Sequence, residues 1–401
     1  MPDLDAHPSG KRRELRSLTG VRFFAALGVL LYHYARDSLG AAPSWLRTLT
    51  ESGAIGVTLF FVLSGFILVY VSSGSDLRDP QVRRNFYVRR VARIYPVYLL
   101  AWLLVGAVSI VRWTTMDVSL SYAARVTALY GGLSALLLQS WVPTAVPVWN
   151  WPGWSLSVEA FFYALFPFLY PALVRFDVRR LWASLVAVFV VNACMHAVVY
   201  SPALATRLIA EGSSFAVTWT DFLSSFPVVR LPEFLFGAIL GQIFVLGRCP
   251  RALQTHNPMW LASVAVAILA LMATSPDAFG WVRRDALFVP LFGGLVLILA
   301  TSEPRVASSQ RRRNVGDWLV LLGAASYATY ILQSPLWALW RMLTGIPAPM
   351  ALHQVAAFIA VLLVISVLVY KGFERPAERW IKRAFVRASE PIEGRVQPVA
   401  D

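Results

Sequence analysis

The sequence is poor in cysteine and in charged side chains. Only two cysteines occur in 401 residues, Cys194 inside an apolar run and Cys249 in a short loop. This excludes a disulfide framework and a zinc site built from cysteines, and we expect no bound metal. Charged residues make up 14% of the chain, whereas soluble globular domains have about 25%. No sizeable soluble domain is therefore expected.

Acidic residues are also few, 22 against 36 lysines and arginines, which gives a formal net charge of +14. In a soluble protein this excess would indicate nucleic-acid binding. Here the arginines lie in short clusters between apolar runs, the distribution that membrane topology requires. We therefore expect a lipid bilayer as partner and no nucleic acid.

Apolar residues, in contrast, make up 57% of the chain. They form eleven stretches near the length of about 20 residues that crosses a bilayer. No internal repeat or linker divides them, so they indicate one membrane domain. The stretches are approximately 17–36, 53–71, 94–111, 127–142, 155–174, 181–199, 228–246, 259–275, 286–300, 318–340 and 354–372.

These observations predict an all-α, polytopic transmembrane helical bundle, a multi-pass membrane protein. We expect a cytoplasmic N-terminal tail at 1–16, the transmembrane domain at 17–373 and a basic cytoplasmic C-terminal tail at 374–401. Basic clusters mark the inner side. They are Lys11 to Arg16, Arg78 to Arg93, Arg175 to Arg180, Arg248 with Arg251, Arg311 to Arg313, and Arg375 to Arg387.

Two inner termini require an even number of crossings, and eleven stretches are odd. The stretch that does not cross is expected within 94–142, where two apolar runs must together cross the membrane once. The shorter run, 127–142, contains Gly131 and Gly132 and is predicted to be re-entrant or interfacial. About ten crossings are therefore expected.

Arg22 and His33 lie in the first apolar stretch. Eleven helical steps put them roughly 16 Å apart on nearly the same face. Ionisable groups within a span usually face a cavity or a proton relay. The alternative for His33 is a buried imidazole bonded to a backbone carbonyl. Asp37 either orients His33 or is solvated at the outer rim.

Arg90 and Arg93 lie one helical turn apart before the third stretch, and their planar forks suit phosphate oxygens. Positive-inside topology alone also explains such a cluster. Glu159 lies more than a turn inside another stretch, where it can act as a base, orient the imidazole or bind a sugar hydroxyl, or pair with a buried arginine. Arg230 and Glu233 are an i,i+3 pair, which is more often structural than catalytic.

Seven short segments occur in one order along nearly the whole chain. They are Leu18–Ala26 with His33, Phe60–Phe66, Arg90–Pro96, Trp154–Glu159, Arg230–Gly237, Ala325–Tyr330 and Phe373–Pro376. In this order they resemble the membrane acyltransferase-3 family of integral-membrane O-acyltransferases.

The resemblance implies a ten-helix domain in the bacterial inner (plasma) membrane, cytoplasmic acyl-CoA as donor, and a catalytic role for His33 supported by Arg22. It also implies that Arg90 and Arg93 act on the donor side. We take His33 and Glu159 as catalytic candidates. The binding candidates are Arg22, Arg90, Arg93, Arg230, Glu233, Ser326 and Tyr327. One departure is Gln333, where many members have histidine.

The expected reaction moves an acyl group, acetyl above others, from acyl-CoA to a hydroxyl of a surface polysaccharide or lipid-linked sugar. No bound cofactor is expected, and polysaccharide-assembly proteins are candidate partners. His33 acts either as general base or as covalent acyl carrier. The competing functions are acylation of a small-molecule or macrolide-type glycoside, and transport by a permease whose ionisable residues line a path.

Overall fold

The computed structural model describes residues 14–386 except 41, 117, 202–203, 205–207, 212–215, 251, 254–256, 274–285, 304–314 and 347–349. Most of the two predicted tails, and the predicted inner cluster Arg311–Arg313, lie outside the described residues.

Ten of the eleven apolar stretches contain a long helix. These helices are α1 (Arg16–Tyr34), α3 (Gly56–Ser72), α4 (Pro80–Thr115), α7 (Trp154–Leu173), α8 (Val178–Val199), α11 (Pro227–Val245), α13 (Asn257–Ala273), α15 (Phe288–Thr301), α17 (Ser326–Thr344) and α18 (Leu352–Val369).

Shorter elements connect the long helices. They are the 3-10 turns η1 (Arg36–Ser38), η2 (Ser52–Ile55), η4 (Gln139–Trp141) and η5 (Trp151–Gly153), the π-helical turns η3 (Thr127–Gly131) and η7 (Tyr370–Glu374), and the helices α2 (Ser44–Glu51), α5 (Leu120–Val126), α6 (Gly132–Ala135), α10 (Trp219–Ser224), α16 (Val315–Ala324) and α19 (Arg375–Phe385).

Within the described residues, six helical segments are long and apolar enough to cross a membrane, or seven with one bent pair. That pair is α16 and α17, which meet at an angle of 56°. The apolar helices α13 and α15 are shorter than a bilayer crossing requires. The chain is thus a multi-pass membrane protein, and the number of ten crossings stays a prediction.

The structure distinguishes the two runs within 94–142. α4 is a continuous helix of 36 residues, which begins at Pro80 with the Asp79 side chain accepting hydrogen bonds from the next backbone N–H groups. The second run is broken into the π-helical turn η3, the four-residue helix α6 and a series of turns. Only α4 has the length of a crossing.

One element lies outside an all-α description. Strands β1 (Leu208–Glu211) and β2 (Ala216–Thr218) form a two-stranded antiparallel hairpin in the connection between α8 and α10. Pairing lets two extended segments satisfy each other's backbone groups without a helix. The rest of the described secondary structure is helical.

Glycines bring α3 and α11 into close contact. A Cβ atom on Gly237 would lie 1.9 Å from the Val62 carbonyl oxygen, and one on Gly65 would lie 2.0 Å from the Phe234 carbonyl oxygen. Small residues allow this approach between membrane helices. The helices that carry Ser64 and Arg230 are thereby held in fixed register.

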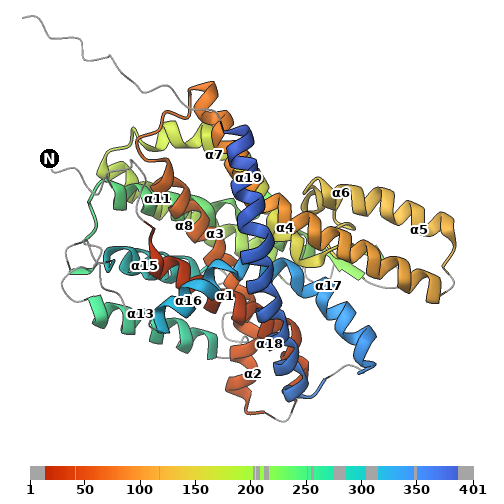
Figure 1. Cartoon of the computed structure of the whole chain (residues 1–401). Coiled ribbons are helices and arrows are strands. Elements are labelled where there is room, and N and C mark those ends of the chain that lie inside the picture. Colours follow the sequence, from red (N-terminus) through yellow and green to blue (C-terminus); the bar gives the residue numbers. More distant parts are fainter. Residues whose placement is uncertain are drawn as a thin grey trace, which may run out of the picture.

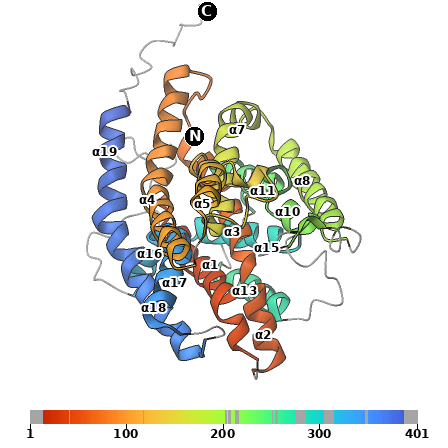
Figure 2. The ribbon, with the colours of Figure 1, turned by 90° about the vertical axis from the view of Figure 1, so that its right-hand side faces the viewer.

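α18, η7 and α19 follow one another as a single long rod, of which η7 and α19 lie beside α4 (Figures 1 and 2). The boundary predicted at residue 373 is therefore not a break in the structure. Glu374, the last residue of η7, is fully buried against α4.

Candidate functional site

A pair of cavities lies along α1. We call the first the arginine cavity, because Arg22, Arg90 and Arg93 line it; its volume is about 320 Å³. We call the second the His33 cavity, and its volume is about 600 Å³. Val57 and Tyr330 line both cavities and so form the wall between them.

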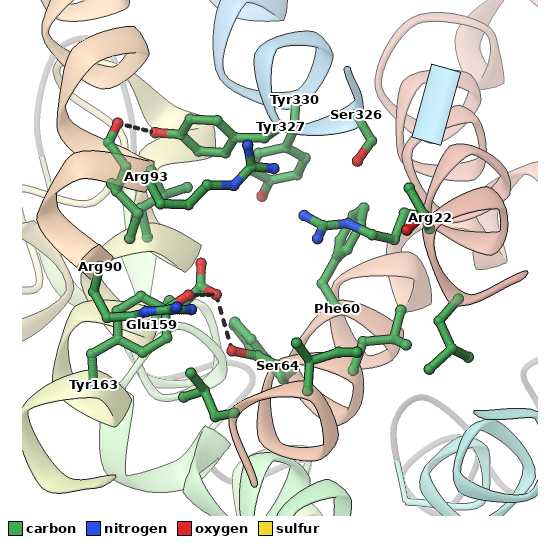
Figure 3. Close-up of a pocket in the computed structure, with 18 of the residues that line it drawn as sticks. Arg22, Phe60, Ser64, Arg90, Arg93, Glu159, Tyr163, Ser326, Tyr327 and Tyr330 are labelled. Carbon is green, nitrogen blue, oxygen red and sulfur yellow. Dashed lines mark hydrogen bonds between the residues drawn. The ribbon is translucent and has the colours of Figure 1, made fainter. Parts of the chain in front are cut away.

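Arginines enter the arginine cavity from opposite sides (Figure 3). Arg22 extends from α1, and Arg90 and Arg93 extend from α4. The guanidinium of Arg22 lies 5.7 Å from the ring centre of Phe60, and that of Arg90 lies 5.8 Å from that of Tyr163. These distances allow cation–π attraction.

Arg22 and Arg90 each have a buried Nε atom with no hydrogen-bond partner among the described residues. A buried donor without a partner costs free energy. An anion bound between these two side chains would provide the missing acceptors.

Arg93 differs from the other two arginines because it pairs with a carboxylate. Its Nη1 atom contacts Glu374, and Glu378 Oε2 lies 3.9 Å away. The ring of Tyr327 lies 5.8 Å from the Arg93 guanidinium. Arg93 therefore lines the arginine cavity, but one end of its guanidinium is already paired with Glu374.

Glu159 faces the arginine cavity, where it accepts hydrogen bonds from Ser64 Oγ at 3.0 Å and from the Tyr163 hydroxyl (Figure 3). His33 lines the other cavity. The alternative in which Glu159 orients the imidazole is therefore wrong. Its carboxylate balances part of the positive charge of the arginine cavity.

His33 lies between a polar and an aromatic side chain. Its Nδ1 atom is 2.8 Å from Gln333 Oε1. Its ring meets that of Trp151 edge-on, with 4.2 Å between centroids. Asp37 is 71% exposed and pairs with Arg36 at 3.4 Å, so it does not orient His33. Among the described residues, the hydrogen-bond partner of His33 is this side-chain amide and not the backbone carbonyl of the alternative.

Arg230 reaches the His33 cavity with its orientation fixed by several contacts. It donates to Glu233 Oε1 at 2.7 Å and to the Ser224 carbonyl at 2.6 Å, and its guanidinium lies 5.7 Å from the ring of Trp154. Glu233 is fully buried behind it and does not line the cavity. The structure thus places Glu233 as the residue that holds Arg230.

The remaining two candidates lie on α17. Ser326 lines the arginine cavity with a buried hydroxyl that has no hydrogen-bond partner among the described residues. Tyr327 donates to the Ile94 carbonyl at 2.7 Å, which joins α17 to α4. Of the two, Ser326 has the hydrogen-bonding capacity left for a ligand.

Sequence reasoning did not assign roles to several residues that contact the candidates. Ser64 and Glu374 stand in the motif segments, which is the one signal that singles them out. Trp151 carries no distinguishing signal in a region rich in tryptophan. Tyr163, one helical turn after Glu159, is identifiable only from its spacing.

The chain matches the family model described as "Acyltransferase domain" over residues 15–371. It therefore belongs to the membrane acyltransferase-3 family, as the motif series indicated, and it is a membrane O-acyltransferase. This assignment replaces the permease alternative. No solved structure matches the chain.

Three relatives illustrate the range of the family. The chain is 31% identical to Acyltransferase MdmB of Streptomyces mycarofaciens, over 79% of this chain and 77% of that protein. It is 26% identical to the Putative peptidoglycan O-acetyltransferase YrhL of Bacillus subtilis, over 95% and 57% of the two chains. It is 23% identical to the O-acetyltransferase OatA of Staphylococcus aureus, over 81% and 51%. The chain thus spans about half the length of the last two proteins.

Proposed function

We propose that this protein transfers an acyl group, acetyl above others, from acyl-CoA in the arginine cavity to a carbohydrate hydroxyl in the His33 cavity. One observation carries the proposal. Arg22 and Arg90, each with a buried Nε that has no hydrogen-bond partner among the described residues, line one cavity, His33 lines the next, and Val57 and Tyr330 line both.

The chemistry of the arginine cavity suits the donor. Guanidinium groups bind phosphate oxygens through paired hydrogen bonds, and acyl-CoA carries phosphates. The volume of about 320 Å³ is at the lower end for small-molecule sites. It suits the phosphate-bearing part of the donor, with the acyl end directed toward Tyr330 and the adenine end nearer the opening.

The chemistry of the His33 cavity supports a carbohydrate acceptor. Trp151 and Trp154 offer aromatic faces, and Glu51, Asp221 and Arg230 offer polar groups. This combination of apolar walls with a few polar groups is typical of small-molecule sites. YrhL is named a putative peptidoglycan O-acetyltransferase, which favours a cell-surface sugar here.

In the general-base mechanism, His33 accepts the proton of the acceptor hydroxyl while the hydroxyl oxygen attacks the thioester carbonyl. The new bond is C–O, the broken bond is C–S, and the coenzyme A thiolate leaves and takes up the proton. In the covalent mechanism, a ring nitrogen of His33 attacks the thioester and the coenzyme A thiolate leaves. The acceptor hydroxyl then attacks the acyl-imidazole, the C–N bond breaks, and the hydroxyl proton passes to the released imidazole and then to solvent. Both mechanisms require an unprotonated ring nitrogen on His33.

Purified protein in detergent tests the function. With radiolabelled acetyl-CoA and a membrane glycan extract, we expect label in the glycan and release of free coenzyme A. The same preparation heated beforehand is the control. Absence of both transfer and donor hydrolysis, with acetyl-CoA and with longer acyl-CoA donors, would contradict the proposal. A deletion strain whose surface glycans lose an acetyl mass would identify the acceptor.

We also propose that both termini are cytoplasmic and that the protein lies in the bacterial inner membrane, with about ten crossings. The distribution of basic residues supports this orientation. Single cysteines replacing Ser9 and Ala400, in a variant without Cys194 and Cys249, should react with an impermeant thiol reagent only after the cells are opened. Labelling of either position in intact cells would contradict the orientation.

Arg90→Lys is expected to raise the KM for acetyl-CoA about tenfold, or roughly 1.4 kcal/mol, because lysine keeps the charge but loses the planar fork. Steady-state kinetics in detergent measures the change. Arg89→Lys is the matched control, since Arg89 is exposed on the same helix and does not line the cavity. An unchanged KM for Arg90→Lys would leave topology as the explanation for this arginine.

A further inference from the structure

Gln333 is fully buried, and the two ends of its side-chain amide have different partners. Its Nε2 donates to the backbone carbonyl of Tyr330 at 2.7 Å. Its Oε1 lies 2.8 Å from His33 Nδ1. A backbone carbonyl only accepts hydrogen bonds, so the nitrogen end of the amide must face Tyr330. The oxygen end therefore faces His33.

This orientation determines which nitrogen of His33 carries the proton. An amide oxygen only accepts, so Nδ1 must be the donor and must be protonated. A neutral imidazole has one N–H group, which leaves the Nε2 atom of His33 with its lone pair. Within the described part of the chain, no hydrogen bond reaches this Nε2.

The position of Gln333 is itself fixed by a break in the hydrogen bonding of α17. Pro335 has no N–H group, so the carbonyl of Ile331 loses its helical partner. Asn150 Nδ2 donates to this carbonyl at 3.1 Å. Asn150 directly precedes η5, which carries Trp151. The Asn150 contact thus joins the two segments that enclose His33.

We propose that Gln333 is a positioning residue, which holds His33 as the Nδ1–H tautomer and leaves the lone pair of Nε2 for the proton or acyl group of the reaction. This inference rests on the proposed function of His33. The partner of a reacting histidine commonly determines its tautomer. Here an uncharged amide does so without the negative charge by which a carboxylate stabilises the imidazolium.

The variants Gln333→Met and Gln333→Glu test whether the hydrogen-bond acceptor for His33 is what matters at position 333. Methionine has similar length but no strong acceptor, so both tautomers become available. We expect kcat to fall roughly 10–100-fold, the range for partners that orient a histidine, with the KM values nearly unchanged. Glutamate restores the acceptor for Nδ1–H. We expect kcat within about tenfold of wild type and the acid limb of the rate–pH profile at higher pH, because the carboxylate favours the protonated ring.

Rates are measured per mole of monodisperse protein, so loss of folded protein does not count as loss of kcat. Gln242→Met is the matched control, because Gln242 is also buried but lines neither cavity. It should keep the wild-type kcat. A purely structural Gln333 would give a different order, with reduced yield but normal kcat for Met and a worse outcome for Glu.

Wild-type kcat in folded Gln333→Met, or a Glu variant less active than the Met variant, would overturn the inference. An unshifted rate–pH profile in an active Glu variant would overturn it as well. Should the wild-type protein itself transfer no acyl group, the proposed function fails first.

Discussion

His33→Ala is expected to reduce acyl transfer by about 10²–10⁴-fold, the usual contribution of a general base, while the protein still inserts and folds. The reason is that His33 is the one histidine that lines either cavity among the described residues. Replacing it removes the group that takes the hydroxyl proton or carries the acyl group. Transfer of label from acetyl-CoA, per mole of monodisperse protein, measures the effect.

His33→Gln should be no more active than His33→Ala. The glutamine amide forms hydrogen bonds as an imidazole does, but it does not take up the proton of the acceptor hydroxyl. His353→Ala is the matched control, since His353 is exposed and lines neither cavity. A well-folded His33→Gln variant with near-normal turnover would remove His33 from the chemistry. Label retained on His33 after acetyl-CoA alone would select the covalent mechanism over the general-base mechanism.

Glu374→Ala is expected to destabilise the protein by about 3–5 kcal/mol, the cost of leaving a buried charge without its partner. Glu374 is fully buried, and the Arg93 side chain is only 25% exposed. The measurement is thermal unfolding in detergent, followed through reaction of the buried Cys249 with a thiol dye, in a Cys194→Ser background.

Glu378→Ala is the control for this change, because Glu378 lies 3.9 Å from Arg93 and is 20% exposed. Its unfolding midpoint should fall much less. Combining Glu374→Ala with Arg93→Leu should recover part of the loss, since no unpaired charge then remains buried. Equal midpoints for Glu374→Ala and Glu378→Ala would show that the Arg93–Glu374 pair does not hold η7 against α4.

The helices were largely predictable because the bilayer dictates their length. The expected stretch 155–174 corresponds to α7 (Trp154–Leu173), and 228–246 corresponds to α11 (Pro227–Val245). The bend between α16 and α17 was not predictable from the run 318–340. At Gly323 a Cβ atom would lie 1.8 Å from the Thr19 carbonyl oxygen. Such a contact with α1 belongs to the tertiary fold and leaves no periodic signal.

For the site, the sequence identified side chains better than it identified their partners. A single helix carries Arg22 and His33, so their spacing alone put them on one stripe. Gln333 is separated from His33 by 300 residues, and Glu374 from Arg93 by 281. No local pattern connects positions so far apart. The alternative in which Glu159 orients His33 could not be decided from the sequence for the same reason, since the two residues lie on different helices whose facing sides were unknown.

Val57 and Tyr330 are the two residues that line both cavities, so in the proposed function the choice of donor and the choice of acceptor depend on largely separate sets of side chains. Redesign of acceptor preference can therefore be confined to positions such as Trp151 and Asp221, with the arginines left intact.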